Sequence, residues 1–587
     1  MKKIISLVLS LLLIAGCSTP ASNEGSMKAG TYTASAAGYH GDITIAVTVD
    51  SSSIKSIEVT DENETEGIGK AALPNLVDQA VKDQTIEVDV VSGATITSEG
   101  FKTALKDAMT QAGADFSKFS TASGSTEVEQ VEETTDVVVV GGGVAGLSAA
   151  LTTQQQGKKV ILVEKMSIAG GASAMAGAGT TATGSKWQEE DGYEDSPESL
   201  KADMMKNGHN YNDEATLDIF VNTVGAAFDW IVSEDGANVP YVRTEGGGRT
   251  YSAEGRGAGV VTSLTNSFTE GGGTLYLGTK GTELIVEDNV VKGIKATAKG
   301  KEYTIHADSV ILATGGFGNN DEMIPEEIQT EYVYAGAAGA EGDGLKMAEA
   351  VDAATINMEF INVQPNSIVM PSGLGQYTNP GVGKAYGVGG AFLVNENGER
   401  FTNEQGNAYD LIQAMKVNKA NYLILNEEAF NAFNEGMMGS KIYSEDDVKE
   451  WLANAGASNP VMIEGKTLAD LETSLSLPEG SLSTSAEKFD ASVKNGKDEY
   501  GRELKGEITT DGPYYAIQMW LRYYATLGGL KINDKMQVVN SKNEPIQGLY
   551  AAGEVVGGLE GDIYYGGSLF GWAVTSGHNA GLSVIEE

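Results

Sequence analysis

The sequence predicts an α/β protein whose main part is a Rossmann-type dinucleotide-binding domain, interrupted by an inserted α+β domain and preceded by a small α+β domain. The apolar run at 137–140 is followed at once by the glycine-rich segment GGGVAG at 141–146, which is the strand–turn–helix pattern of a Rossmann unit. Strand-then-glycine segments return much later, at 309–316 and 548–553. This separation indicates a domain split by an insertion, and 587 residues are too many for a single core.

The first residues have the pattern of an export signal. A basic start precedes an apolar stretch at 4–15 that is too short to span a bilayer. The segment IAGC at 14–17 resembles a bacterial lipobox, which implies lipidation of Cys17. We therefore expect a lipoprotein signal peptide at 1–16, a tether at 17–27, and attachment to an extracytoplasmic cell-surface membrane through the lipid alone. An ordinary signal peptide with an accidental cysteine is the alternative.

The composition excludes several functions. The chain has 40 Lys and Arg against 81 Asp and Glu, a net charge of −41, whereas nucleic-acid binding needs clustered basic side chains. A single cysteine leaves no disulfide, no cysteine-ligated iron–sulfur cluster and no C-x-x-C-H haem site. The four histidines show no metal-binding spacing. We expect neither a nucleic-acid partner nor a metal.

The small domain is expected at 28–116. Its periodicity predicts two strands and two helices, at 43–46, 54–59, 71–81 and 98–112. Ser98 is a plausible N-cap for the second helix. The polar stretch that follows, at 117–135, predicts a linker that lets the small domain move.

The glycine-rich segment predicts FAD as a ligand. Its glycines permit a tight turn and let backbone amides approach the pyrophosphate at the start of a helix at 144–156. Glu164, which ends a second strand, is placed to accept the ribose hydroxyls. The sequence has no second such fingerprint for NAD(P)H, so electrons are expected to arrive another way. We expect the FAD-binding domain at 136–360 and 521–587, around an insertion at 361–520.

Five further segments carry a family resemblance: EKM at 164–166, GGAS at 170–173, ATGG at 313–316, GDG at 342–344 and AAGE at 551–554. They resemble the flavoprotein subunit of fumarate reductases, and in particular soluble flavocytochromes c and urocanate reductases. The resemblance implies non-covalent FAD and an inserted capping domain that closes over substrate. The residues that it implies for FAD binding are Gly141, Gly143, Ala145, Gly146, Glu164, Lys165, Gly171, Ala172, Ser173, Gly177, Gly179, Thr314, Gly315, Asp343, Glu554, Ser568 and Leu569.

A second flavin site is implied by the segment DVVSGAT at 89–95. Together with GYHG at 38–41 and EGIG at 66–69, it resembles the covalent-FMN domain of the same reductases and of sodium-pumping quinone reductase subunits. The resemblance implies FMN attached through its phosphate to Thr95, and a flavin transferase as the maturation partner. The neighbouring residues of this site are Ser92, Gly93 and Ala94. A glycine turn capped by a threonine is the alternative.

The family reduces an activated C=C bond with a hydride from FAD N5 and a proton from an arginine. The segment GERFTNE at 398–404 matches the segment that carries this arginine, so the resemblance makes Arg400 the candidate catalytic acid. Because the pKa of arginine lies above about 12, it is a poor acid unless it is pre-positioned. A structural arginine paired with Glu404 is an equally open alternative, and a tyrosine is the next candidate donor.

Several charged groups of fumarate reductases are replaced in this chain. By resemblance, two histidines and an arginine that hold the dicarboxylate align with Gln364, Tyr524 and Tyr564, the candidate substrate-binding residues. The family's proton-relay Glu and Arg align with Lys384 and Gly387. A pocket of Gln and Tyr lacks the cations that a second buried carboxylate needs. An aromatic enoate or enone that stacks on tyrosines is therefore expected rather than fumarate.

Together these features predict an exported reductase. Electrons would pass from a membrane flavin or quinone chain through FMN to FAD, and on to the C=C bond of a small-molecule acceptor resembling urocanate or an aryl acrylate. Two alternatives stay open. One is a ketosteroid-type FAD dehydrogenase, a distant relation that uses tyrosines near the position of Tyr564. The other is a non-catalytic flavin electron-carrier lipoprotein.

Overall fold

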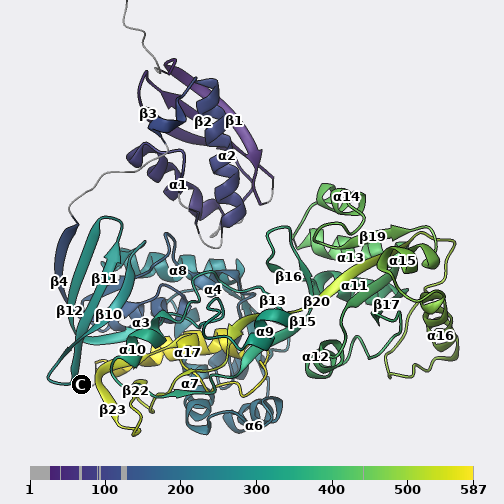
Figure 1. Cartoon of the computed structure of the whole chain (residues 1–587). Coiled ribbons are helices and arrows are strands. Elements are labelled where there is room, and N and C mark those ends of the chain that lie inside the picture. The colour runs from purple at the N-terminus through teal and green to yellow at the C-terminus, as the bar shows by residue number, and fades with distance from the viewer. Residues whose placement is uncertain are drawn as a thin grey trace, which may run out of the picture.

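The computed structural model describes residues 27–39, 41–64, 69–88, 90–91, 94–119, 128–440 and 442–585. Cys17, Ser92 and Gly93 lie outside these residues, as does the side chain of Thr95. Figure 1 shows three parts, with the small domain above two larger ones that lie side by side. We call them the small domain (27–119), the large domain (128–360 and 521–585) and the inserted domain (361–520). The predicted α/β class is confirmed.

The small domain is an antiparallel sheet packed against two helices. Its strands pair in the order β1-β2-β3, and alternate residues of β2 from Ile43 to Val49 are buried, because successive side chains of a strand point to opposite faces. Its elements are β1 (Gly30–Ala37), β2 (Asp42–Val49), β3 (Ile54–Asp61), α1 (Gly69–Asp83), α2 (Thr95–Gln111) and the 3-10 turn η1 (Phe116–Lys118).

The start of α2 differs from the predicted one. The helix begins at Thr95 with Ala94 as its N-cap, so Ser98 lies inside the helix and the N-cap prediction is wrong. The Ser98 hydroxyl accepts a hydrogen bond from the Val91 amide at 3.0 Å and donates to the Ala94 carbonyl at 2.8 Å. The Ser98 side chain therefore bonds the helix to the segment before it. Because α2 begins at Thr95, this residue lies at the positive end of the helix dipole.

The large domain is built on a sheet in which β12, β4, β5 and β9 run parallel, and β23 extends it beside β12. Val140 lies level with Val163 and Leu312, so three strands end at one edge, where α/β folds bind ligands. These strands are β4 (Glu129–Val140), β5 (Val160–Val163), β9 (Thr274–Tyr276), β12 (Lys301–Leu312) and β23 (Pro545–Ala551); β10 (Lys280–Glu287), β11 (Val290–Ala298) and β22 (Gln537–Val539) complete the sheet.

Helices of the large domain cover this sheet. α3 packs against α17, and α17 packs against α7. α7 has the length and hydropathy of a membrane span, the one such helix in the described part of the chain, but half of it is buried, as in the core helix of a globular domain. The helices are α3 (Val144–Gln155), α4 (Gly171–Met175), α5 (Lys186–Asp191), α6 (Pro197–Asn207), α7 (Glu214–Val232), α8 (Arg256–Glu270), α9 (Glu326–Glu331), α10 (Asp343–Glu349) and α17 (Ser568–Ser583).

Short elements complete the large domain. They are β6 (Gly179–Thr181), β7 (Tyr241–Val242), β8 (Thr250–Ala253), β13 (Val333–Tyr334), β14 (Thr355–Ile356), β21 (Gly529–Leu530) and the 3-10 turn η2 (Gly553–Val555). β6, β8 and β7 form a small separate sheet. β4 begins at Glu129 and pairs with β12 from Lys301 onward, so the last residues of the predicted linker at 117–135 belong to the sheet.

The inserted domain has its own sheet, ordered β16-β15-β20-β18-β17. β20 is long, and its last residues return the chain to the large domain (Figure 1). The elements are β15 (Ile361–Val369), β16 (Gly375–Tyr377), α11 (Asn379–Val388), β17 (Ala391–Asn395), α12 (Ala408–Lys416), β18 (Asn421–Asn426), α13 (Glu427–Gly439), α14 (Glu445–Ala453), β19 (Met462–Gly465), α15 (Leu468–Leu475), α16 (Ser481–Asn495) and β20 (Tyr514–Thr526).

The small domain contacts both neighbours. The Asn75 amide donates to the Ser167 carbonyl at 2.6 Å, and Ile168 of the large domain packs against the small domain's core. Burial raises the pKa of Tyr39, and the nearby Tyr377 of the inserted domain adds to this shift. The face of the small domain that carries Tyr39 therefore lies at the junction of all three parts.

Candidate active site

The turn after β4 has the geometry of a pyrophosphate site. Gly141 has a φ of +112°, and a Cβ there would lie 2.2 Å from the Ala313 carbonyl oxygen. A Cβ on Gly146 would lie 1.9 Å from the Gly141 carbonyl oxygen. Both positions therefore require glycine. Gly143 is the N-cap of α3, and the Val144 amide donates to the Ser173 hydroxyl at 3.2 Å.

Glu164 lies beside this turn, as predicted for a ribose-binding acid. Its carboxylate accepts hydrogen bonds from the amides of Gly142 at 2.6 Å and Met166 at 2.7 Å. Burial raises the pKa of this carboxyl group in spite of those bonds. A buried acid held by two backbone amides is fixed in position, with lone pairs left over to accept ligand hydroxyls.

Lys165 and Asp343 form an ion pair on the same side of the sheet. Their Nζ–Oδ2 distance is 2.6 Å, and Lys280 also contacts Asp343 at 2.8 Å. Asp343 begins α10. The hydroxyl of Thr314 lies nearby and is buried without a hydrogen-bond partner in the described protein. An orphan hydroxyl of this kind fits a polar ligand group, because buried polar atoms are nearly always hydrogen-bonded.

The remaining predicted FAD residues lie on four short segments. Gly171, Gly177 and Gly315 each have open space where a Cβ would stand, which suits close approach of a ligand to the backbone. Ala172 and Ser173 belong to α4, Gly179 opens β6, and Ser568 and Leu569 open α17. The alanine of the glycine-rich turn, Ala145, is buried in α3.

Two buried carboxyl groups support the C-terminal side of the site. Glu554 accepts hydrogen bonds from the amide of Thr526 at 2.9 Å and from its hydroxyl at 3.3 Å, and burial raises the pKa of Glu554 to about 7. Glu560 accepts a short hydrogen bond from the Ser568 hydroxyl, and burial raises its pKa to about 8. The residues present therefore fit a dinucleotide with a polar ring system.

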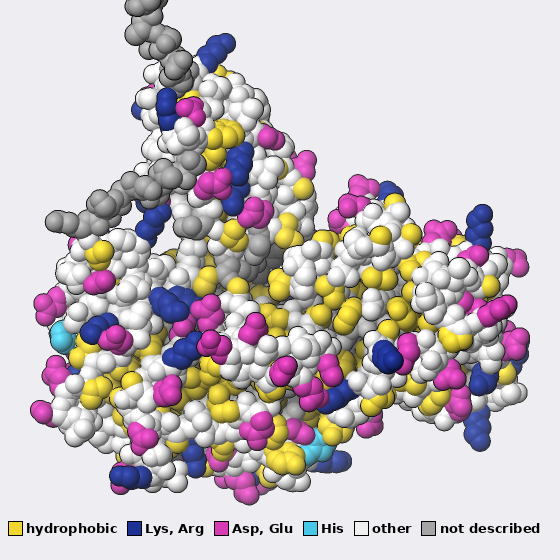
Figure 2. Space-filling model, in the orientation of Figure 1, with side chains coloured by type: hydrophobic (Ala, Val, Ile, Leu, Met, Phe, Trp, Pro, Cys, Tyr) yellow, Lys and Arg dark blue, Asp and Glu magenta, His cyan; other side chains and the backbone are white. Residues whose placement is uncertain are grey.

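Gln364, Tyr524 and Tyr564, the predicted substrate-binding residues, are brought together where the large and inserted domains meet. Gln364 donates to Asn362 at 3.1 Å within β15, and Asn362 lies beside the Tyr524 hydroxyl. Tyr524 is close enough to Tyr564 to contribute to its raised pKa, whose main cause is burial. Figure 2 shows hydrophobic side chains gathered over this junction, while acidic ones are spread over the outer faces in view.

Tyr564 is held in one orientation. Its hydroxyl oxygen accepts a hydrogen bond from the Gly567 amide at 2.7 Å. That amide precedes α17, so the phenol lies beside the positive end of a helix. The bond uses a lone pair of the oxygen and leaves its proton available to a ligand.

Arg522 also belongs to this cluster, and sequence reasoning missed it. It stands opposite Gln364 in the β15–β20 register. Its guanidinium lies 5.5 Å from the centre of the Tyr524 ring and 5.8 Å from that of Tyr377. Burial lowers the pKa of Arg522. Alternation along β20 could have placed it beside Tyr524, because residues two apart on a strand share a face.

Arg400 lies elsewhere. Its guanidinium donates to Glu404 at 3.1 Å and to Asp498 at 2.8 Å, and it stands over the rings of Phe489 and Tyr500. The pairing with Glu404 is the structural alternative raised above. Burial lowers the pKa of Arg400, but the two carboxylates outweigh it and raise this pKa above its ordinary value.

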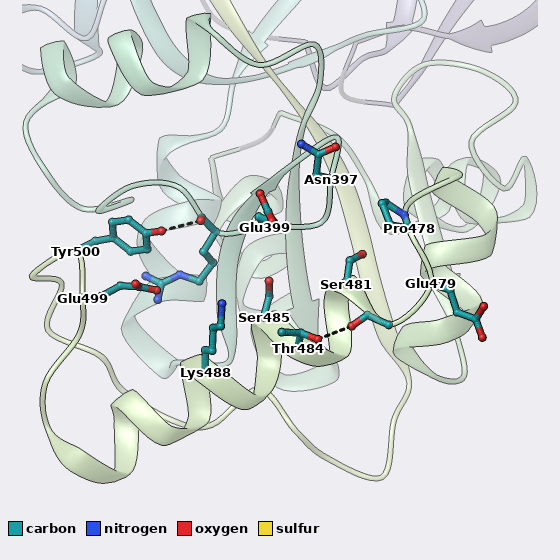
Figure 3. Close-up of a pocket in the computed structure, with 12 residues that line it drawn as sticks. Asn397, Glu399, Pro478, Glu479, Ser481, Thr484, Ser485, Lys488, Glu499 and Tyr500 are labelled. Carbon is teal, nitrogen blue, oxygen red and sulfur yellow. Dashed lines mark hydrogen bonds between the residues drawn. The ribbon is translucent and has the colours of Figure 1, made fainter.

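A polar pocket beside α16 is lined by Arg400 together with Lys488, Glu499 and Tyr500. The Tyr500 hydroxyl donates to the Arg400 carbonyl at 2.8 Å, and Figure 3 shows Tyr500, Glu499 and Lys488 among the residues that line the pocket. In Figure 1, α16 stands at the end of the inserted domain farthest from the large domain. Lys384 pairs with Glu435 at the surface, and Gly387 lies on the same helix, α11. The predicted acid and relay positions are thus not assembled with Gln364 and the tyrosines.

The small domain presents Thr95 as the first residue of α2, after the buried Ala94. Glu64 closes the same end of the domain: it accepts from the Thr97 hydroxyl at 2.5 Å and from the Tyr39 amide at 2.7 Å. A phosphate ester at the first residue of a helix is favoured by the unpaired amides and the dipole. In the part of the chain that the structure describes, no group of three or more His, Cys, Asp or Glu side chains could hold a metal ion.

The fold and this site define a flavin-dependent oxidoreductase. Residues 136–569 match the FAD binding domain family, and residues 38–110 match the FMN-binding domain family. The chain is 31% identical to a urocanate reductase from Eggerthella lenta over 93% of this chain and 91% of that protein. It is 32% identical to a fumarate reductase (cytochrome) from Shewanella frigidimarina, over 72% of each.

A solved structure agrees with these relatives. The open conformation of a flavocytochrome c3 fumarate reductase matches with a TM-score of 0.63 and 28% identity, over 77% of this chain and 79% of that one. The chain belongs to the fumarate reductase and urocanate reductase family of FAD-dependent enzymes, which act on the C=C bonds of enoates. The family matches confirm FAD in the large domain and support covalently attached FMN in the small one.

Proposed function

We propose that this protein is an exported reductase whose acceptor is an aromatic or other planar enoate or enone, resembling urocanate or an aryl acrylate rather than fumarate. The observation that carries this proposal is the cluster of Gln364, Tyr524 and Tyr564 at the junction of the large and inserted domains. Aromatic walls favour planar substrates by stacking and by burial of apolar surface. The cluster replaces the two histidines and one arginine that the resemblance places around a dicarboxylate.

The chemistry divides between the cofactor and this chain's own residues. Reduced FAD supplies a hydride to one carbon of the C=C bond. The protein must then deliver a proton to the other carbon, and we assign this role to Tyr564. The Gly567 amide donates to its oxygen and would stabilise the phenolate left after proton transfer. Arg400 is disfavoured, because two carboxylates occupy its guanidinium and it lies apart from Gln364 and the tyrosines, in the pocket beside α16.

In this proposal Thr95 would hold FMN, which would supply electrons to FAD and would itself take them from a membrane flavin or quinone chain. The contacts of the small domain with Ser167 and Tyr377 support the route, since they hold it at the junction of the other two domains. Lipidation of Cys17 would keep the protein at the membrane where that chain operates. Detergent phase partitioning tests the anchor: wild-type protein found in the aqueous phase would contradict it.

An acceptor panel tests the function. With reduced methyl viologen as donor, we expect urocanate, trans-cinnamate or 4-hydroxycinnamate to reoxidise the enzyme, and fumarate to be reduced at least about 100-fold more slowly. Each charge-assisted hydrogen bond missing from a buried carboxylate costs about 1.5–3 kcal/mol, or about one to two orders of magnitude in rate. Fumarate reduction as fast as that of the best aryl acrylate would contradict the proposal.

The attachment site gives a separate prediction. A Thr95→Ala variant co-expressed with a flavin transferase should lack the mass increment of FMN, because the phosphoester needs the threonine hydroxyl. Thr97→Ala is a matched control, since its hydroxyl already donates to Glu64. Intact-protein mass spectrometry measures both variants, and FAD should still be released from each on denaturation. FMN retained on the Thr95→Ala protein would move the attachment elsewhere.

A further inference from the structure

Arg522 is a buried cation that has no carboxylate partner in the part of the chain that the structure describes. Only 8% of its surface is exposed, and among the described residues its guanidinium donates to backbone carbonyls alone, those of Pro365 at 3.0 Å and Asn366 at 3.2 Å, both through Nη1. Taking a guanidinium out of water is costly unless an anion compensates it. Two neutral acceptors leave the positive charge uncompensated and the Nε and Nη2 donors available.

The other buried arginines are neutralised. Arg400 and Arg502 share Glu404, and Arg400 also binds Asp498. Arg249, which contacts Tyr565 near the cluster, is paired with Asp195 at 2.6 Å. Arg522 differs from these arginines, because its neighbours are the rings of Tyr377 and Tyr524 and not carboxylates.

The surroundings of Arg522 offer further donors. Asn362 is fully buried; its Nδ2 lies beside the Tyr524 hydroxyl but makes no hydrogen bond of good geometry within the described protein. Gln364 stands across the strand pair from Arg522 and bonds to Asn362. A guanidinium and two side-chain amides at neighbouring positions of one strand pair are a suitable donor set for a carboxylate, which accepts several hydrogen bonds in one plane.

We infer that Arg522 binds the carboxylate of the acceptor, with Asn362 and Gln364 as auxiliary donors, and that the site selects acids with a single carboxylate. The inference rests on the proposed function and sharpens it. One uncompensated cation matches one carboxylate, and Tyr524 and Tyr564 are left for the conjugated or aromatic part of the same molecule. An enoate acid is therefore preferred over its ester or the matching enone.

The test compares acids with their methyl esters. The holoenzyme and its Arg522→Gln variant are assayed with trans-cinnamate, urocanate and 4-hydroxycinnamate and with the methyl ester of each, using reduced methyl viologen. We expect KM for the acids to rise about 10- to 100-fold in the variant, the loss of a charge-assisted bond, while KM for the esters changes less than about twofold. Arg522→Lys should fall between, because lysine keeps the charge but not the planar fork.

Two controls separate binding from folding. Arg243→Gln removes an arginine that is paired with Glu190 and Asp191 at the surface, and it should leave the acid-to-ester ratio unchanged. Millimolar guanidinium ion should partly restore acid reduction in an Arg522→Ala variant, which a structural defect would not allow. An acid-to-ester ratio that is equal in wild type and Arg522→Gln overturns this inference and leaves the proposed function standing. Failure of every acid and ester to reoxidise wild-type enzyme overturns both.

Discussion

Replacing Tyr564 with phenylalanine is expected to lower kcat about 10²- to 10⁴-fold, the usual contribution of a positioned general acid. The change removes one oxygen, which accepts the Gly567 amide and in our proposal donates the proton that completes reduction of the C=C bond. KM and FAD content should change little, because the ring stays in place. Stopped-flow reoxidation of the reduced enzyme by the best acceptor measures the step directly.

Tyr565 provides the matched control. Its hydroxyl accepts from the Arg249 guanidinium at 2.8 Å, so Tyr565→Phe removes a neighbouring phenolic hydroxyl without losing the proposed donor. That variant should keep kcat within a few-fold of wild type, since Arg249 retains its ion pairs with Asp195 and Asp203. Near-normal turnover by Tyr564→Phe would contradict the assignment, and Tyr524→Phe would then be the next variant to measure.

Replacing Arg400 with alanine is expected to destabilise the inserted domain by about 3–5 kcal/mol, the cost of breaking a buried ion pair from one side. Glu404 and Asp498, whose side chains are fully buried, would be left with less positive charge beside them. Limited proteolysis and thermal denaturation should show earlier unfolding of 361–520, while FAD content is retained. The acid-to-ester ratio should not change.

A double variant distinguishes a structural Arg400 from a catalytic one. Adding Asp498→Asn to Arg400→Ala removes one stranded charge, so the double variant should be less unstable than the sum of the two single ones. Activity at a temperature where Arg400→Ala is folded should approach that of wild type. A folded Arg400→Ala protein with turnover reduced 100-fold or more (about 2.7 kcal/mol) would return the proton donor to Arg400.

The sequence predicted the parts of this protein that are local in the chain. The strand and turn from 137 to 146, Glu164 and the glycine turn after β12 are each contiguous signals, and the structure has them at one sheet edge. The end of the predicted linker at 117–135 could not be recognised as a strand from the sequence. The first residues of β4 are polar, and they form a strand only because they pair with β12, which lies far along the chain.

The roles of two arginines could not be separated from sequence. Arg400 stands in a motif, but Asp498, which occupies its guanidinium, lies 98 residues away. Arg522 stands in no motif. Alternation along β20 could place it beside Tyr524, but its pairing with Gln364 depends on an irregular register, in which β20 carries one residue more than β15 between Asn362 and Val363. That no described acid pairs with Arg522 is a property of the packed domain, and no short segment of the sequence shows it.

The strand β20 has a consequence for the catalytic cycle. It passes through the inserted domain's sheet and ends at Thr526, which bonds to Glu554 in the large domain. Arg522 and Tyr524 lie in the last five residues of β20, whereas Tyr564 belongs to the segment before α17. In our proposal a bound acceptor thus contacts both the inserted domain and the large domain, which β20 connects. Rotation of the inserted domain about β20 would move Arg522 away from Tyr564. The same movement would then release the product and separate the carboxylate-binding residue from the proton donor.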